Sequence, residues 1–223
     1  EQQQIIMDQR QTNIVSLRRT IYLTIQSSVS VEECVHKLLK MNLRSGQEIE
    51  LCQMIVDSCA QQRTYERFFG LLGQHFCSIK KEYVECFEKI FQDQYELIHR
   101  LENVKLRNVT KFFAHLLVND SISWGVLCCI DLNEEETTSS SRVCIKNLFL
   151  ELVEFLGITK LNNRLTDPTL TKYFQGIFPR NNPKKTRFAI NFFTKIGLSE
   201  LTYELRKFMK RNPTSMLHQL EIV

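Results

Sequence analysis

The sequence predicts an all-α fold, an irregular repeat of helical hairpins extended by a further helical bundle, on three observations. One apolar spacing, i, i+3, i+4, i+7 and i+8, recurs along the chain without giving way to the alternation of strands. Only 7 Gly and 4 Pro are present among 223 residues, too few for the many turns of an all-β protein. An apolar content of 43% is ample for a core of stacked helices. The six clearest apolar segments begin at Val31, Leu51, Tyr65, Tyr83, Val109 and Ile145.

Start and stop signals place the helices of the N-terminal part, after a polar, Gln-rich lead-in over residues 1–12 that is expected to be helical or frayed. Ser30 and Glu33 form a capping box at one helix start, and Thr64 is a good N-cap for another. The apolar residues 124–130 favour a final helical turn over a buried strand. The predicted helices cover residues 13–26, 30–41, 48–60, 64 onward, 80–92, 94–101 and 108–119.

The segment 133–140 is acidic and then rich in Ser and Thr, and we expect a linker because it offers little to bury. It separates a domain of residues 13–132 from an extension of residues 141–211, and a tail of residues 212–223 follows. Asp167-Pro168 and Asn182-Pro183 are helix start signals, because Pro suits the first helical position. Helices of the extension are therefore expected at residues 141–156, from 168, 183–196 and 198–211.

The eight cysteines lie mostly on the apolar stripes without metal-ligand spacing. Reduced thiols that pack as small hydrophobic groups are expected, which favours a cytosolic or nuclear compartment. No apolar run approaches the roughly 20 residues that span a bilayer, so no membrane partner is expected. Because the first residue is not Met, we expect the chain to be part of a longer protein.

The net charge of +4 is unevenly distributed, with +8 over residues 171–211 and −3 over residues 1–170. A helix start that carries Lys and Arg is a plausible phosphate contact, and the alternative is a solvated turn kept soluble by its charge. The candidate contacts to RNA or to a protein partner are Arg180, Lys184, Lys185, Arg187, Lys207, Lys210 and Arg211. The aromatic residues nearby have helical spacing and are expected in the core rather than stacked on bases: Phe174, Phe178, Phe188, Phe192 and Phe193.

No catalytic, cofactor-binding or metal-binding residues are predicted, and neither a cofactor nor a small-molecule substrate is expected. The five histidines match no ligand spacing, and His115 is expected to be a hydrogen-bonded core residue. Gly70-Leu-Leu-Gly73 matches the GxxG of a KH module but lies in a periodic helix, where small residues let two helices approach closely. The acidic face of Glu82, Glu85 and Glu88 is expected to be solvated, or else to meet a basic partner.

The stretches 31–39, 47–60 and 65–77 resemble the MA-3 domain family, the stacked helical-hairpin modules of translation-initiation scaffolds and of a cell-death tumour suppressor. The block Tyr83-Val-Glu-Cys-Phe-Glu-Lys-Ile-Phe91 looks closer still to a spliceosome-associated splicing factor of this family. The same likeness continues in the basic turn Phe178-Pro-Arg-Asn-Asn-Pro183. It covers about residues 13–211 and includes the helices beyond the expected linker.

The resemblance implies a HEAT- or armadillo-like fold and a non-catalytic scaffold or docking role in nuclear pre-mRNA splicing. It implies spliceosomal core proteins as partners, with pre-mRNA or snRNA nearby, and docking on the large core protein near the upstream exon. It also implies a link to exon junction complex assembly. The DEAD-box helicase of that complex would be held by a separate domain that is absent from this chain.

Other MA-3 domains bind helicases of the initiation-factor class through acidic residues just before and at the start of their second helix. Those positions fall here on Thr24 and Ser30, which carry no charge. This departure disfavours direct helicase binding by this chain. Docking on spliceosomal proteins is the leading function, and direct RNA binding through the seven basic residues and helicase regulation are the alternatives.

Overall fold

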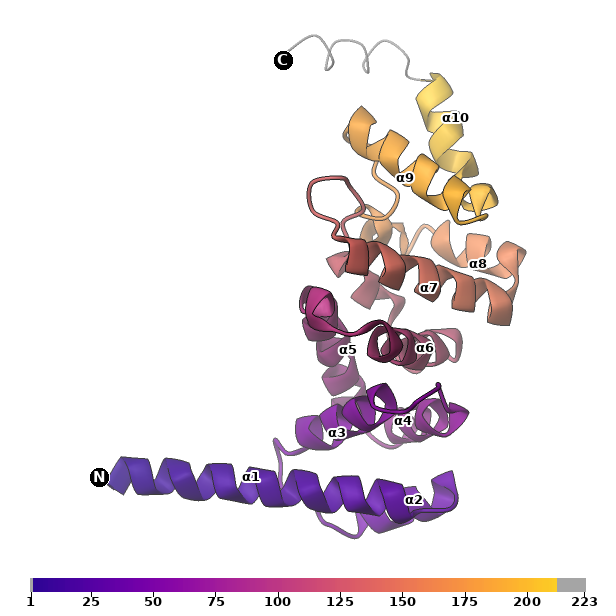
Figure 1. The fold of residues 1–223 in the computed structure, drawn as a ribbon. Helices are drawn as coiled ribbons and strands as arrows, with labels where there is room; N and C mark the ends of the chain where they lie inside the picture. Colours follow the sequence, from indigo (N-terminus) through magenta and orange to yellow (C-terminus); the bar gives the residue numbers. More distant parts are fainter. Residues whose placement is uncertain (1, 212–223) are drawn as a thin grey trace. The chain divides into compact units, whose positions relative to one another are not determined.

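The computed structural model describes residues 2–211, which contain ten α-helices, four short 3₁₀-helices and no strand in that range (Figure 1). The all-α prediction is confirmed. The predicted tail at residues 212–223 lies outside the described residues. The chain divides into two compact units, called here the N-terminal unit (Glu1–Ile122) and the C-terminal unit (Ser123–Val223).

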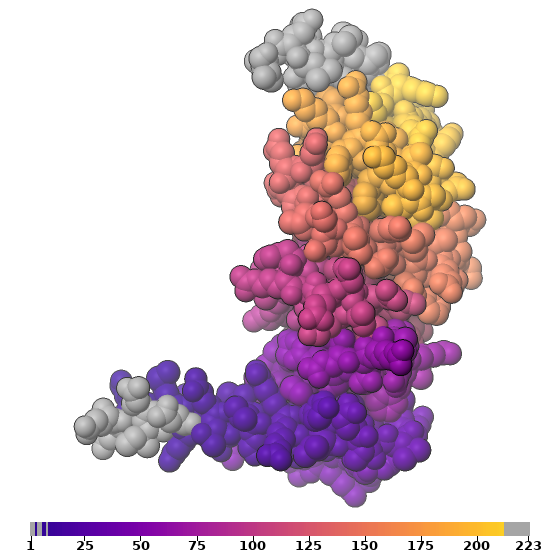
Figure 2. Space-filling model, viewed as in Figure 1, coloured from indigo at the N-terminus to yellow at the C-terminus, as the bar shows by residue number. Residues whose placement is uncertain are grey.

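The N-terminal unit is built from helical pairs whose successive members stack on one another. Helix α3 contacts α1, α4, α5 and α6, and α4 contacts α2, α5 and α6. The N-terminal half of α1 extends beyond the other helices of this unit (Figures 1 and 2). The elements are α1 (Gln2–Ser27), α2 (Val31–Leu39), α3 (Glu48–Ala60), α4 (Arg67–Ile79), α5 (Lys81–Glu96), η1 (Ile98–Arg100) and α6 (Asn103–Val118). Side chains from the predicted apolar stripes fill the core, among them Leu38, Leu51, Ile55, Leu72, Phe76, Phe87, Phe112 and Phe113.

The predicted capping box at α2 is present in the structure. The Ser30 hydroxyl accepts a hydrogen bond from the Glu33 backbone N–H at 3.2 Å. The Glu33 carboxylate accepts one from the backbone N–H of Val29, one residue before the cap, at 3.0 Å. Two backbone donors at the helix start are thereby satisfied.

The polar lead-in takes the helical one of its two expected forms, as the first part of one continuous helix from Gln2. Three boundaries in this unit differ from the predicted ones. Residues 94–96 continue α5 instead of starting a new helix, and α6 begins at Asn103 rather than at residue 108. No Gly or Pro lies between residues 74 and 124, so nothing local interrupts α5. The N-cap prediction at Thr64 is wrong, because the chain stays extended through Glu66 (φ −110°, ψ 126°) before α4 begins.

The two glycines of α4 allow the close approach to α6 that the sequence predicts. A Cβ on Gly73 would lie 2.8 Å from Cζ of Phe112, and one on Gly70 would lie 2.7 Å from Cγ of His115. Both distances are shorter than atomic contacts permit. The GxxG sequence is therefore a helix-packing feature within α4.

We expect Gly73→Ala to destabilise the chain, because the fully buried Phe112 ring must move. Overpacking costs about 1–3 kcal/mol, which exceeds the gain of about 1 kcal/mol from replacing Gly by Ala in a helix. Urea denaturation measures the free energy of unfolding. His75→Ala, an exposed site on the same helix, is the control and should change it by less than about 0.5 kcal/mol. A Gly73→Ala variant as stable as the unaltered chain would contradict the close approach.

The C-terminal unit is a second helical bundle around an aromatic cluster. Phe193 stacks on Phe178 with ring centroids 5.1 Å apart, and meets Phe149 edge-on at 5.0 Å. The unit's elements are η2 (Trp124–Cys129), α7 (Ser139–Leu156), α8 (Ile158–Leu165), η3 (Thr171–Phe174), α9 (Pro183–Lys195), η4 (Ser199–Thr202) and α10 (Tyr203–Arg211). Helix α9 packs against η4 and α10, and α7 and α8 lie side by side (Figure 1).

The expected linker at residues 133–140 is a hydrogen-bonded turn that leads into α7. The Asn133 side chain is buried, and its carbonyl accepts from the backbone N–H groups of Glu135 and Glu136 at 3.0 and 2.9 Å. Thr138 then caps α7, because its hydroxyl accepts from the Ser141 N–H at 3.1 Å. Buried Asn, Thr and Ser side chains with backbone partners give this segment more to bury than its composition indicates. The expected limits of the domain, residues 13–132, and of the extension, residues 141–211, stay predictions.

Two helix predictions in this unit need correction. Helix α8 was not predicted, although Ile158, Leu161 and Leu165 have helical spacing. The helix expected from Asp167-Pro168 is absent, and the chain makes a turn and the short η3 instead. The Asp167 carboxylate accepts from both the N–H and the hydroxyl of Thr169, at 2.8 and 2.7 Å, which stabilises a turn rather than a helix.

Residues 123–132 should stabilise the C-terminal unit, because their apolar side chains are buried within it. Trp124 lies under the guanidinium of Arg164 at 5.3 Å, and the Leu132 N–H donates to Gly176 O at 2.9 Å. We expect a fragment of residues 123–211 to melt well above a fragment of residues 133–211, since each lost buried side chain costs about 1.5–3 kcal/mol. Circular dichroism melting of the two fragments checks this, and equal melting temperatures would contradict it.

Candidate interaction site

The basic turn before α9 is held in one conformation by side-chain hydrogen bonds. The side-chain carbonyl of Asn182, the predicted N-cap, accepts hydrogen bonds from the backbone N–H groups of Lys184 and Lys185 at 2.9 and 3.3 Å. The buried Thr186 hydroxyl lies 2.7 Å from Pro179 O and 2.9 Å from Asn182 O. The first amides of α9 therefore have acceptors already, so an anion here would meet side chains rather than free backbone donors.

The seven predicted basic residues have different surroundings. The Lys185 ammonium lies 3.5 Å from Asp131 Oδ2, and that of Lys207 lies 3.9 Å from Glu204 Oε1. Lys184, Arg187, Lys210 and Arg211 are exposed, and none has an ion pair within residues 2–211. Arg180 is likewise exposed and has no ion pair in that range, so five of the seven cations are available to a partner.

The aromatic residues of this region are confirmed as packing residues. Phe174 and Phe193 are buried, and Phe192 meets Phe193 edge-on at 5.5 Å. The guanidinium of Arg142 covers the Phe188 ring at 5.3 Å. Phe178 is half-buried between Phe193 and a groove. Stacking of several bases on these rings is therefore excluded by their packing.

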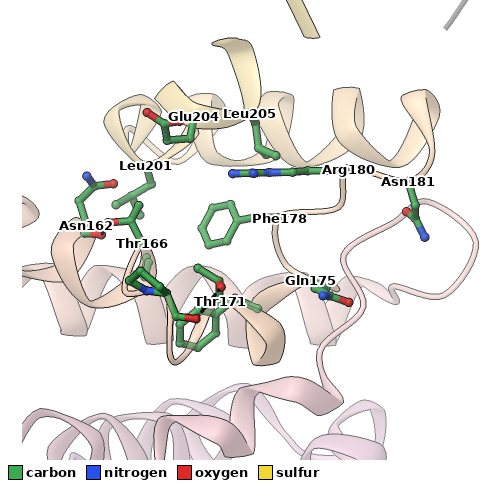
Figure 3. Close-up of a pocket in the computed structure, with 13 residues that line it drawn as sticks. Asn162, Thr166, Thr171, Gln175, Phe178, Arg180, Asn181, Leu201, Glu204 and Leu205 are labelled. Carbon is green, nitrogen blue, oxygen red and sulfur yellow. Dashed lines mark hydrogen bonds between the residues drawn. The ribbon is translucent and has the colours of Figure 1, made fainter. Parts of the chain in front are cut away.

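The groove beside Phe178 lies within the C-terminal unit and has a volume of about 850 Å³ (Figure 3). The Arg180 side chain extends above the Phe178 ring, with Leu205 above Arg180 and Leu201 to the left of the ring (Figure 3). Its apolar lining includes Leu165, Pro168, Phe174, Phe178, Leu201 and Leu205. Its polar lining includes Asn162, Thr166, Thr171, Gln175, Arg180, Asn181 and Glu204.

The sequence predicted only Arg180 among the residues of this groove as a functional residue. Most of the others were missed because they come from α8, η3, η4 and the turns between them, which the sequence prediction omitted or merged with other elements, whereas Glu204 and Leu205 belong to α10. The helical spacing of Ile158, Leu161 and Leu165 is the one signal that pointed to a further helix here.

Across residues 2–211 no group of three or more His, Cys, Asp or Glu side chains is arranged to hold a metal ion. The cysteines are free thiols, and burial raises the pKa of Cys59 and of Cys77 to about 12. Such thiols are protonated and unreactive at neutral pH. No helix of the described part is long and apolar enough to cross a membrane.

Two predictions concern the N-terminal unit: an acidic face on α5, and uncharged residues at the positions where other MA-3 domains bind helicases. Glu82 and Glu85 are exposed and pair with Lys80 and Lys81 at 3.7 and 3.0 Å. The Thr24 hydroxyl donates to Thr20 O within α1 at 2.8 Å, and Ser30 caps α2. Neither Thr24 nor Ser30 offers a charge to a helicase. No contact in this unit favours the helicase alternative.

Residues 17–123 match the family model of the MA3 domain. The chain contains an MA3 domain. The match ends one residue beyond the N-terminal unit, whose stacked helical pairs are the HEAT-like repeat expected of this family. The MA3 domain is a non-catalytic, protein-binding module, as the sequence predicted.

The similarity to individual proteins extends through both units. The chain is 60% identical over 214 residues to the pre-mRNA-splicing factor CWC22 homolog of Homo sapiens, which covers 96% of this chain and 24% of that protein. It is 59% identical over 211 residues to the Drosophila melanogaster homolog, covering 95% of this chain and 16% of that protein. It is 49% identical over 214 residues to CWC22 of Mycosarcoma maydis, covering 96% and 24%. The expected similarity to this splicing factor, also called nucampholin, is confirmed, and the chain spans a quarter or less of these relatives.

The buried His115 of the MA3 domain should make stability depend on pH. Its Nε2 lies 2.9 Å from Gln74 Oε1, and burial, followed by the charge of Arg67, lowers its pKa below 6.5. The unfolded chain therefore binds the proton more readily, and stability present above about pH 6.5 is lost as the pH falls through the folded pKa.

The measurement is the free energy of unfolding at pH 7.5 and pH 5.0 for the unaltered chain and for His115→Gln. We expect the unaltered chain to lose more stability on acidification than the variant, because only it carries this titration. Equal losses in the two proteins would contradict a neutral, buried His115.

Proposed function

We propose that this chain is a docking module of a nuclear pre-mRNA splicing factor and acts within the spliceosome. The observation that carries the proposal is the identity of about 60% to proteins named pre-mRNA-splicing factor CWC22, over both units of the chain. Its partners are spliceosomal core proteins, with pre-mRNA or snRNA close by. The role is linked to exon junction complex assembly, whose helicase binds a domain outside this chain.

Docking by surface complementarity fits the features of the MA3 domain. Its helices bury their apolar stripes in one another, so partners meet the helix backs and the turns between them. Val15 on α1 and Val29 in the turn before α2 are 66% and 92% exposed. A partner that covers these side chains removes apolar surface from water, which favours binding.

Crosslinking mass spectrometry on spliceosomes assembled in nuclear extract tests the docking function. The tagged 223-residue chain is added, and its lysines are expected to crosslink to spliceosomal core proteins. Val15→Asp combined with Val29→Asp should reduce crosslinks from the MA3 domain, whereas His75→Ala, at an exposed polar site, should not. Absence of crosslinks above those of an unrelated helical protein would refute the proposal.

Direct RNA binding is a second candidate, favoured by the exposed cations of α9 and α10 that lack ion pairs. If it occurs, affinity for a single-stranded oligouridine should fall about tenfold between 50 and 200 mM salt, because three or so phosphate contacts release counterions. Lys184→Glu, Arg187→Glu and Lys210→Glu together should abolish that binding.

The matched control reverses three exposed cations of the MA3 domain, Arg63, Lys89 and Arg107, with the same change in net charge. Filter binding or fluorescence anisotropy measures both triple variants. Equal losses in the two variants would show attraction by net charge alone and would remove a specific RNA site on α9 and α10.

A further inference from the structure

The groove of the C-terminal unit has the composition of a peptide-binding site rather than of a packing defect. Its volume of about 850 Å³ exceeds the space of a single side chain. Its apolar floor, as the term is used here, consists of the half-buried Phe178 with the buried Leu201 and Leu205, and polar side chains also line the groove. Burying one large apolar side chain on such a floor contributes about 1.5–3 kcal/mol.

Arg180 provides an available cation at this floor. Its side chain is exposed, and its guanidinium lies 5.8 Å from the Phe208 ring. The acid that shares the groove, Glu204, pairs instead with Lys207 at 3.9 Å. Within residues 2–211, Arg180 has no carboxylate partner. A planar guanidinium held on an aromatic ring is well placed to bind a carboxylate with two hydrogen bonds.

Three carboxamides complete the polar lining, those of Asn162, Gln175 and Asn181. None of them has a hydrogen-bond partner within the described part of the chain. Each carboxamide can donate and accept, which matches the alternating N–H and C=O groups of an extended peptide. A nucleotide base fits less well, because one face of the Phe178 ring is already covered by Phe193.

We infer that this groove binds an extended segment of a partner protein that carries an acidic residue close to a large apolar one. The apolar side chain lies on Phe178, Leu201 and Leu205, and the Asp or Glu carboxylate pairs with Arg180. The inference rests on the docking function proposed above and assigns one partner contact to the C-terminal unit. RNA in the groove is the competing outcome.

Selection from a phage-displayed library of random 12-residue peptides on the 223-residue chain provides the probe. Enriched sequences should share Asp or Glu near Leu, Ile, Met or Phe. One such peptide, labelled with fluorescein, is then titrated by fluorescence anisotropy. Arg180→Glu should weaken it about tenfold, because a paired charge is replaced by a like charge, and replacing the peptide's acid by Lys should restore binding to that variant.

Two further variants separate the groove from the surrounding charge. Lys195→Glu makes the same charge change at an exposed position at the end of α9, outside the groove, and should alter affinity by less than about twofold. Thr171→Trp places a large ring in the groove at an exposed position and should abolish binding. Circular dichroism establishes that each variant is folded, and Arg180→Glu, an exposed site, remains informative if Thr171→Trp is not.

The inference is overturned if no acidic-apolar motif is enriched, if Arg180→Glu and Lys195→Glu weaken peptide binding equally, or if a folded Thr171→Trp variant still binds. Displacement of the peptide by oligouridine, lost in Arg180→Glu, would assign the groove to RNA instead. If spliceosomal crosslinks persist while the peptide result fails, the groove is refuted and the docking function stands. Loss of the crosslinks with intact peptide binding would refute the docking function alone.

Discussion

Burial of one apolar face per helix against neighbouring helices is the constraint on which the MA3 domain depends, and α3 is one of its central helices. This helix contacts four others, and eight of its residues are buried, including Cys52, Ser58 and Cys59. The glycines of α4 then bring α6 close enough to cover the remaining side. Because the apolar faces are buried in one another, the outer surfaces of the helices and the turns between them are what this unit offers to a partner.

The helices with strong local signals were predictable to within a residue or two. Helix α3 begins and ends where the sequence predicts, and Asn182 caps α9 as expected. Two of the errors occur where a polar side chain could hydrogen-bond the backbone in either of two local structures. Asp167 stabilises a turn with Thr169 instead of capping a helix, and the side chain of Asn133 stabilises the turn that leads into α7. Such choices depend on contacts with distant residues, such as the bond from Leu132 to Gly176, which no local pattern contains.

The candidate site was predictable in its charges but not in their partners. All seven basic residues are visible in the sequence as an uneven charge distribution. Which of them remain available depends on tertiary pairs such as Lys185 with Asp131, which lie far apart in the sequence. The groove is less visible still, because its lining spans residues 162–205 and includes short 3₁₀ elements with little periodicity.

Thr186 connects the two features of the C-terminal unit that offer binding groups. Its buried hydroxyl lies within hydrogen-bonding distance of Pro179 O, so the chain immediately before Arg180 is fixed to the first turn of α9. Arg180 is thereby directed over the groove, and Lys184 and Arg187 start an exposed face of α9. Because Asn182 already satisfies the helix amides, recognition on either side of this turn depends on side-chain cations. Such cations distinguish a carboxylate from a phosphate by the groups around them, and an apolar floor with carboxamides beside Arg180 favours the carboxylate of a peptide.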